Sequence, residues 1–310
     1  MNKVSHITII IVSYNVKALL LKCLQSIYSN LDESLVIEVI VIDNDSSDDS
    51  VEAIQELFPQ VILIGNKFNA GFSGANNQGI QIAQGEFIFL LNPDTEIIGN
   101  AIFQLANYID NHSDCSIVAP KLLNSDKTLQ MSAWNNHHPI DLIIETFYFH
   151  KIFQRLSYSF EEMKNTLEVK TLSGAALFFK KELIQKIGML DESLFWMEDI
   201  DFSKRAQTFG KLIYLPSSQV IHHSGQSQKK NYNVAIANQL LSKLKYYKKH
   251  HSAPVVIIAT VCTFIFIISR LIVFTILSFL KPIYLAKSRA YFCSLNKYFK
   301  FLFLNDNKLV

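Results

Sequence analysis

The chain has 310 residues, of which 49% are apolar and 18% charged, and this composition excludes an intrinsically disordered protein. Ten glycines and seven prolines are too few for a collagen-like or low-complexity chain. The four cysteines form no C-x-x-C pair, so the sequence predicts neither a disulfide framework nor a thiolate zinc site, and it favours a reducing compartment.

The net charge of +2 conceals two oppositely charged parts of the chain. Residues 1–242 carry 18 basic and 26 acidic side chains, whereas residues 243–310 carry 11 basic side chains and one acidic side chain. We therefore expect two domains, a folded body over residues 1–250 and a helical tail over residues 251–310.

Apolar strands alternate with amphipathic helices through the first ninety residues. The predicted strands cover residues 7–12, 36–42, 61–64 and 86–91, and the helices between them cover residues 18–28, 49–58 and 73–83. The first apolar run is too short for the core of a signal peptide. Strands rich in β-branched residues that alternate with helices predict an α/β fold, with a mostly parallel sheet covered by helices on both faces.

The regular pattern is lost over residues 121–170, which predicts an irregular insert, and it returns at Thr171. Two further helices are predicted. One covers residues 200–209 and ends at Gly210, a residue favoured just past a helix end, and the other covers residues 234–250.

A strongly apolar run follows, because 18 of the 26 residues in 255–280 are Val, Ile, Leu or Phe and only Arg270 is charged. A helix of this length reaches about 39 Å, enough to cross about 30 Å of hydrocarbon. Lysines lie on both sides of the run, so a bend near Arg270 or helices lying in the membrane interface fit better than a single crossing. The sequence thus predicts that residues 255–304 contact membrane lipid. A buried helical hairpin that covers the body is the alternative.

Polar segments follow three of the predicted strands, and they cover residues 43–48, 69–77 and 92–96. Such residues also form turns and helix caps, but parallel sheets bind ligands beyond the carboxyl ends of their strands. Neither G-x-G-x-x-G nor a P-loop motif occurs, which disfavours a dinucleotide enzyme and a P-loop nucleotidase. A carboxylate at a strand end can instead hold Mg²⁺ or Mn²⁺ on a diphosphate, and Asp94 is the candidate.

Two more clusters could carry chemistry. Glu198, Asp199 and Asp201 stand at a predicted helix start, where acids also serve as caps and favour the helix dipole. Desolvation beside Phe195 and Trp196 can raise the pKa of a carboxylate in this cluster, and repulsion by Glu198 would raise that of Asp199, which would make it a better base. Asp201 would point about 200° away around the helix, so the two aspartates cannot share one role. His222 and His223 form the other cluster, although a histidine pair is often only structural.

The order of these motifs resembles that of family 2 glycosyltransferases, and most closely a bacterial, rhamnosyltransferase-like subset, over residues 5–250. The motifs are Val12-Ser13-Tyr14-Asn15, Asp43-Asn44-Asp45-Ser46, Asn69-Ala70-Gly71-Phe72-Ser73-Gly74, Leu91-Asn92-Pro93-Asp94, Ser173-Gly174-Ala175, Leu190-Asp191-Glu192, Glu198-Asp199-Ile200-Asp201 and His222-x-x-Gly225-x-Ser227. The resemblance implies a GT-A fold, a nucleotide-diphosphate-sugar donor, a divalent cation and an inverting displacement.

The resemblance also implies roles for individual residues. Asp199 would be the general base with Glu198 beside it, and Asp94 and His222 would hold Mg²⁺ or Mn²⁺. Asn92 replaces the first acid of the family's D-x-D motif, which removes one charge, and spacing to Gly225 and Ser227 favours His222 over His223. The donor would contact Ser13, Tyr14, Asp43, Asn69, Gly71, Gly74, Asn77 and Gly174, with Asp43 on the pyrimidine base.

We therefore expect an inverting glycosyltransferase at the cytoplasmic face of the inner or plasma membrane of a bacterium. It would transfer a sugar, with L-rhamnose favoured, to a lipid-linked or surface-polysaccharide acceptor. No nucleic-acid partner is expected. A non-catalytic, membrane-associated scaffold that retains the GT-A fold is the alternative, and the presence of Asp94, Glu198, Asp199 and His222 argues against it.

Overall fold

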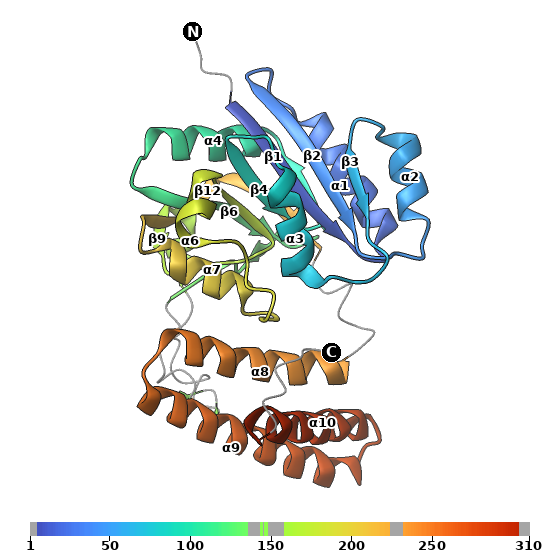
Figure 1. Cartoon of the computed structure of the whole chain (residues 1–310), viewed down its shortest axis with the longest axis vertical. Coiled ribbons are helices and arrows are strands. Elements are labelled where there is room, and N and C mark those ends of the chain that lie inside the picture. Colours follow the sequence, from blue (N-terminus) through green and yellow to red (C-terminus); the bar gives the residue numbers. More distant parts are fainter. Residues whose placement is uncertain (1–4, 136–142, 145, 148–157, 224–231, 304–310) are drawn as a thin grey trace. The chain divides into compact units, whose positions relative to one another are not determined.

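The computed structural model describes residues 5–135, 143–144, 146–147, 158–223 and 232–303, and Figure 1 labels its elements. The strands are β1 (Ser5–Ser13), β2 (Leu35–Asp43), β3 (Ile62–Gly65), β4 (Phe87–Leu91), β5 (Thr95–Ile98), β6 (Cys115–Leu123), β7 (Leu129–Gln130), β8 (Ala133–Trp134), β9 (Leu167–Val169), β10 (Thr171–Leu172), β11 (Ala176–Lys180) and β12 (Lys211–His222). The helices are α1 (Lys17–Ser29), α2 (Ser50–Leu57), α3 (Gly71–Ile82), α4 (Ala101–Asn111), α6 (Glu182–Ile187), α7 (Glu198–Ala206), α8 (Tyr232–His250), α9 (Ala253–Ser278) and α10 (Ile283–Phe303), with a short 3-10 helix at Glu162–Lys164. The elements expected in the first ninety residues are all present, each within two residues of its predicted ends.

A mixed sheet forms the centre of the body, in the order β3-β2-β1-β4-β11-β6-β12-β5. Strands β3, β2, β1 and β4 pair in parallel, and so do β6 and β12. In contrast, β11 runs antiparallel to both β4 and β6, and β5 runs antiparallel to β12. The α/β prediction is therefore confirmed, and the parallel pairing is interrupted where β11 enters the sheet.

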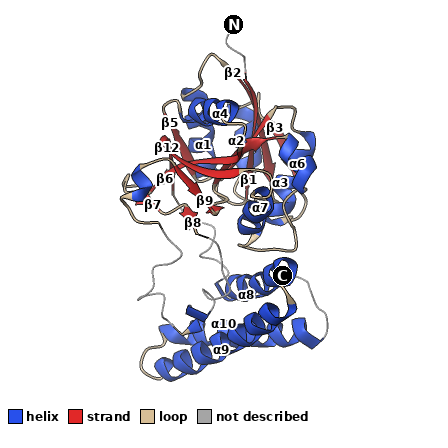
Figure 2. Ribbon diagram, turned by 90° about the vertical axis from the view of Figure 1, so that its left-hand side faces the viewer, coloured by secondary structure: helices blue, strands red, loops and turns tan. Residues whose placement is uncertain are grey.

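Helices cover both faces of this sheet, as predicted (Figures 1 and 2). Alternate residues of β1 point to opposite faces, so Ile9 packs in one apolar layer with α1 and α4, and Ile10 packs in the other with α3, α6 and α7. Gly79 allows α3 to approach β1 closely, because a Cβ at this position would lie 2.5 Å from Ile10 Cγ2. Both faces of the central strands are thus buried, and this explains their continuous apolar sequences.

A buried ion pair holds helix α7 against the chain that precedes it. Asp201 is fully buried, and its carboxylate accepts hydrogen bonds of 2.8 Å from both Nε and Nη2 of Arg205. The same guanidinium donates to the backbone carbonyls of Ile187, Gly188 and Met189. The Arg205 guanidinium is therefore neutralised by one carboxylate and hydrogen-bonded to three consecutive backbone carbonyls.

The chain divides into two compact units, which we describe separately. The first comprises residues 1–135, 157–192 and 198–227, and the second comprises residues 136–156, 193–197 and 228–310. Helix α8 belongs to the second unit, so the boundary expected at residue 250 lies inside that unit, between α8 and α9.

In the second unit, α9 and α10 form an antiparallel hairpin, and α10 also packs on α8. The Thr275 and Ser288 hydroxyls lie 2.7 Å apart near the turn, and the Tyr298 hydroxyl donates to the Thr260 carbonyl at the other end. Arg270 is 4% exposed and donates to the Thr146 carbonyl, and its guanidinium lies 3.6 Å from the Phe266 ring centroid. The single charge of the apolar run is therefore turned toward the interior of the unit.

Helix α9 runs without interruption from Ala253 to Ser278, so the expected bend near Arg270 is absent and the chain reverses after Ser278 instead. Among the described residues, α9 is the one helix whose length and apolar composition would allow it to cross a membrane. Only 28% of its most apolar window is buried, so most of this surface is not packed against the protein.

The ion pair yields a prediction about stability. Asp201→Ala should lower the free energy of unfolding by about 3 kcal/mol, because it leaves the Arg205 guanidinium without its buried counter-ion. Urea unfolding followed by circular dichroism measures this loss. Glu182→Ala removes an exposed pair to Lys186 with the same i,i+4 spacing and should cost less than about 0.5 kcal/mol. Equal losses in the two variants would show that burial of the pair is unimportant.

Candidate active site

The carboxyl ends of β1, β2 and β4 lie at one edge of the sheet, and the predicted site residues begin there. Ser13 is the register partner of Asp43, and Asn92 follows directly after β4. Asn44 links this edge to α3, since its Nδ2 donates to the Gly71 carbonyl at 3.2 Å. Asn44 was part of a motif but was not predicted to have a role of its own.

Ser13 and Asp43 are both buried, with 0% and 2% of their surfaces exposed. Asp43 Oδ2 accepts a hydrogen bond from the Ser46 amide at 2.8 Å, whereas Asp43 Oδ1 and the Ser13 and Ser73 hydroxyls have no partner among the described residues. Buried polar atoms without partners cost free energy, so they indicate a place where a ligand supplies the missing hydrogen bonds. Tyr14, the next residue along, is 45% exposed.

The segment that leads into α3 combines exposed and buried residues. Asn69 is exposed, and its Oδ1 accepts a hydrogen bond from the Gly71 amide at 2.9 Å. Gly71 has a φ of +73°, which favours glycine, and Gly74 is buried near the Glu192 carboxylate. Asn77, in contrast, donates to the Leu190 carbonyl and to Glu192 Oε1, each at 2.9 Å. Its amide hydrogens are both used, so its geometry suits positioning of the 190–192 loop better than direct contact with a donor.

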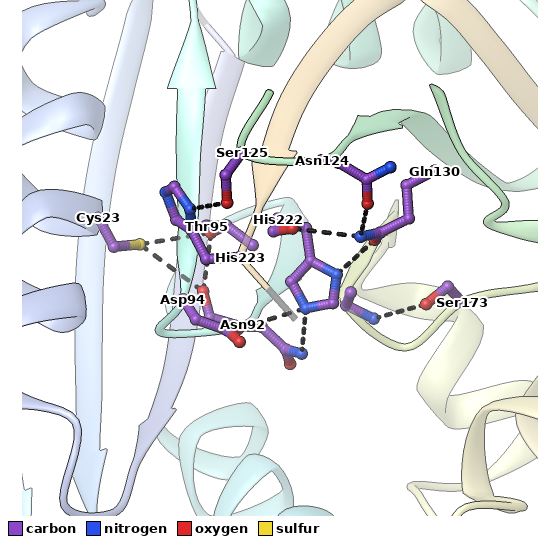
Figure 3. Close-up of polar contacts among 11 residues, drawn as sticks. Cys23, Asn92, Asp94, Thr95, Asn124, Ser125, Gln130, Ser173, His222 and His223 are labelled. Atoms are coloured by element: carbon purple, nitrogen blue, oxygen red, sulfur yellow. Dashed lines mark hydrogen bonds and ion pairs between the residues drawn. The ribbon is translucent and has the colours of Figure 1, made fainter. Parts of the chain in front are cut away.

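Asp94 and His222 come together beyond β4 and at the end of β12 (Figure 3). His222 Nε2 lies 3.3 Å from Asp94 Oδ1 and 3.4 Å from Asn92 Nδ2, and the Asp94 and His222 side chains are 10% and 12% exposed. His222 Nδ1 lies 2.6 Å from Gln130 Oε1. No sequence pattern pointed to Gln130, which lies in the segment predicted to be irregular.

His223 is occupied by other partners. Its Nε2 lies 2.7 Å from Glu96 Oε1, and its Nδ1 lies 2.7 Å from the Ser125 hydroxyl. His223 thus has the same kinds of partner as His222, a carboxylate at Nε2 and a polar side-chain oxygen at Nδ1. The choice of His222 over His223, made from motif spacing, stays a prediction.

The Asp94 and His222 atoms fit a divalent cation. A carboxylate oxygen and an imidazole nitrogen only 3.3 Å apart repel one another when both present lone pairs, and a shared cation removes that repulsion. No group of three or more His, Cys, Asp or Glu side chains in the described part of the chain could hold a metal by itself. The remaining ligands would have to come from water or a bound substrate, as is usual for Mg²⁺.

A buried support lies beneath Asn92. The Thr95 hydroxyl donates to the Asn92 carbonyl at 2.7 Å, and Cys23 Sγ lies 3.5 Å from the same hydroxyl. Burial raises the pKa of the Cys23 thiol to about 12, so Cys23 is a neutral packing group rather than a thiolate ligand.

Asp199 lies at the first turn of α7 and faces Gly174. Its Oδ2 accepts a hydrogen bond from the Gly174 amide at 3.0 Å, and its Oδ1 accepts one from the Ile200 amide at 2.8 Å. A Cβ on Gly174 would lie 3.2 Å from Asp199 Cβ, so glycine keeps this space open. Burial raises the pKa of Asp199, and the two amide hydrogen bonds oppose that shift. The direction agrees with the sequence analysis, and of the two expected causes burial is the main one, whereas repulsion by Glu198 is not among the causes.

One backbone hydrogen bond places these two groups side by side. The Asn92 amide donates to the Ala175 carbonyl at 2.9 Å, and Ala175 directly follows Gly174. The Asp94–His222 pair and the Gly174–Asp199 pair are therefore neighbours at one edge of the sheet. Gly225 and Ser227, which completed the histidine motif, lie outside the described residues.

Comparison with known proteins finds relatives in sequence and in fold. An N-acetylglucosaminyl-diphospho-decaprenol L-rhamnosyltransferase of Mycobacterium tuberculosis is 24% identical over 209 residues, which cover 62% of this chain and 68% of the relative. A mannosyltransferase of Pyrobaculum calidifontis, solved in complex with GDP-Man and Mn²⁺, aligns with a TM-score of 0.56 and 17% identity over 96% of this chain and 87% of that one.

GalNAc-T7, solved with UDP, GalNAc and Mn²⁺, also aligns with a TM-score of 0.56 and 17% identity, over 80% of this chain. This chain spans only 54% of the length of that structure, and at such identity both structures support the fold alone. The sequence model of glycosyl transferase family 2 matches residues 8–188, which is more than half of the chain. This protein therefore belongs to glycosyl transferase family 2.

Proposed function

We propose that this enzyme transfers a sugar, with L-rhamnose the first candidate, from a nucleoside diphosphate to a lipid-linked or surface-polysaccharide acceptor, with inversion at the anomeric carbon. The observation that carries the proposal is the Asn92–Ala175 hydrogen bond, which joins the segment of Gly174 and its half-buried partner Asp199 to that of the Asp94–His222 pair. The rhamnosyltransferase relative supports the choice of sugar and of a lipid-linked acceptor.

The donor nucleotide would lie over the ends of β1 and β2. Asp43 Oδ1 lacks a hydrogen-bond donor, and the Ser13 hydroxyl lacks a partner among the described residues. The N3–H group of a pyrimidine base can supply that donor, which favours a dTDP or UDP sugar. Tyr14 and Asn69 are exposed at the rim of this region, and the Gly71 to Gly74 turn and Gly174 would line the rest of the donor site.

Asp94 Oδ1 and His222 Nε2 would hold Mg²⁺ or Mn²⁺, and the Mn²⁺ in two structural neighbours supports this assignment. An imidazole ligand favours Mn²⁺ over Mg²⁺, because Mg²⁺ prefers oxygen. When bound, the cation would stabilise negative charge on the departing diphosphate. Asn92 stands where the family motif has a second carboxylate. Of Asn92, Asp94 and His222, only Asp94 would therefore bring a negative charge to the cation.

Asp199 would act as the general base. The acceptor hydroxyl gives its proton to the Asp199 carboxylate, its oxygen bonds to the anomeric carbon, and the bond from that carbon to the diphosphate oxygen breaks with its electron pair. The amides of Gly174 and Ile200 hold the carboxylate in place during this transfer. Its raised pKa brings the base closer to neutral pH, where proton transfer is more effective.

A transfer assay over a panel of nucleotide sugars, with a polyprenyl-diphosphate-linked acceptor, tests this function. Asp199→Asn should lower kcat by about 10²- to 10⁴-fold and leave nucleotide affinity unchanged, because only the proton acceptor is lost. The wild-type kcat should fall on acidification, since the base must be deprotonated, with a midpoint above the ordinary aspartate pKa of 3.8. Glu198→Gln is the neighbouring comparison. If that variant were inactive and Asp199→Asn active, the role of base would pass to Glu198, and no transfer with any donor would favour the scaffold alternative.

The cation gives a separate prediction. Excess EDTA should abolish transfer and Mn²⁺ should restore it. Asp94→Ala should stay inactive at Mn²⁺ concentrations that saturate the wild type, because it removes the one carboxylate of the pair. Undiminished transfer in EDTA would instead favour a metal-free diphosphate site that relies on hydrogen bonds from Asn92 or Thr95.

We also propose that the helical unit binds the cytoplasmic face of a bacterial membrane without crossing it. The outward side of α9 carries apolar residues at helical spacing, and Ile257, Val261, Ile272 and Ile276 are each between 51% and 64% exposed. Arg270 is turned inward, so this side carries no charge. Exposed basic side chains on α10 and in the preceding turn, such as Lys281, suit anionic headgroups.

Vesicle flotation without detergent tests the membrane proposal. The wild type should float with vesicles that contain phosphatidylglycerol, and a double variant, Ile257→Asp with Ile276→Asp, should float at least about tenfold less, because two charges would have to enter the apolar layer. Leu57→Asp changes a residue of α2 that is 57% exposed and should float like the wild type. A wild-type protein that stays soluble beside vesicles would contradict membrane binding, and protease cleavage on both sides of sealed vesicles would show a crossing.

A further inference from the structure

The β6–β7 hairpin reaches the proposed cation site through one amide, that of Gln130 at the end of β7 (Figure 3). Gln130 Oε1 lies 2.6 Å from His222 Nδ1, and Gln130 Nε2 donates to the backbone carbonyl of His222 at 3.2 Å. One side chain therefore holds both the ring and the main chain of His222. We propose that Gln130 is a positioning residue that selects the His222 tautomer with its hydrogen on Nδ1 and its lone pair on Nε2. This inference rests on the proposed cation site.

The hydrogen bonds within the turn fix the orientation of the Gln130 amide. The Asp126 carboxylate can only accept, so the Thr128 hydroxyl donates to it, at 2.6 Å. Having used its hydrogen, the Thr128 oxygen accepts from Asn124 Nδ2, at 2.9 Å. Asn124 Oδ1 is then the acceptor for Gln130 Nε2, also at 2.9 Å. Each of these three hydrogen bonds therefore has only one possible donor. Gln130 Nε2 is used toward Asn124, so Gln130 Oε1 faces the His222 imidazole.

A second acceptor confirms this direction independently. The His222 carbonyl can only accept, and it lies beside Gln130 Nε2. Rotation of the amide by 180° would place its oxygen against two acceptors, at a cost of two hydrogen bonds. His222 Nδ1 must therefore donate to Gln130 Oε1. A neutral imidazole has one N–H, so the lone pair of Nε2 faces Asp94.

This tautomer matters because a metal binds an imidazole nitrogen through its lone pair. A hydrogen bond from the other ring nitrogen to a fixed carbonyl oxygen orients the ring and makes it a stronger ligand. The same turn also contacts the adjacent histidine, because the Ser125 hydroxyl lies 2.7 Å from His223 Nδ1. A hydroxyl can donate or accept, so Ser125 does not select a tautomer of His223 as the fixed amide of Gln130 does for His222.

The first experiment needs no variant of Gln130. The histidine side chains of the full-length protein are labelled with ¹⁵N and observed by NMR without metal, and the His222 signals are those absent from His222→Asn. We expect the single ring hydrogen of the neutral His222 imidazole to lie on Nδ1. A hydrogen on Nε2, or an even mixture of the two tautomers, would overturn the inference.

The second experiment measures Mn²⁺ affinity by electron paramagnetic resonance in the presence of UDP or dTDP. Gln130→Met keeps an unbranched side chain of similar length but removes the amide, and should weaken Mn²⁺ binding by about 10- to 100-fold and give a mixed tautomer. Ser125→Ala, in the same turn, removes a hydrogen bond to His223 only and should bind Mn²⁺ like the wild type.

The outcomes separate this inference from the proposed function. Wild-type affinity in Gln130→Met, or an equal loss in Ser125→Ala, would overturn the role of Gln130 and leave the cation site intact. A wild-type protein that transfers sugar but binds no Mn²⁺ with either nucleotide would overturn the cation site and the role of Gln130 together.

Discussion

The parallel pairing of β1 with β2 and β4 is the constraint on which the rest of the site depends. Ser13 is paired with Asp43 and Ile11 with Leu91, so the three strands end at one edge. Apolar residues fill the strands up to that edge, and polar residues begin where burial on both faces stops. A slip of one residue between these strands would turn each buried side chain to the opposite face, so the two apolar layers hold the register firmly.

Two later strands bring the remaining groups to this edge. β11 runs antiparallel beside β4, and the segment before it carries Gly174 and Ala175 next to Asn92. β12 runs antiparallel to β5, which makes His222 the register partner of Thr95 and sets it beside Asp94. Because β11 runs antiparallel to β4, its amino end lies beside the carboxyl end of β4. The loop that precedes β11 therefore lies at the edge of the sheet where the site residues gather.

Helix α7 shows how one short segment can hold two aspartates for different purposes. Asp201 is paired with Arg205, and that charge is satisfied in the folded protein. Asp199 accepts hydrogen bonds from the backbone amides of Gly174 and Ile200, and burial raises its pKa. The two side chains are only two positions apart, and the 100° turn per residue sends them to different surroundings. Helix geometry thus separates the stabilising ion pair from the proposed general base.

Periodicity by itself determined β1 to β4 and α1 to α3, because buried strands and amphipathic helices leave local patterns. Motif resemblance predicted roles for Asp94, Gly174, Asp199 and His222, and the structure brings them to one edge of the sheet. Only the tertiary structure decided the role of Gln130, the inward direction of Arg270 and the grouping of α8 with the later helices. The physical reason is distance along the chain. Gln130 and His222 are 92 positions apart, and a hydrogen bond between them exists only because strand register brings them together.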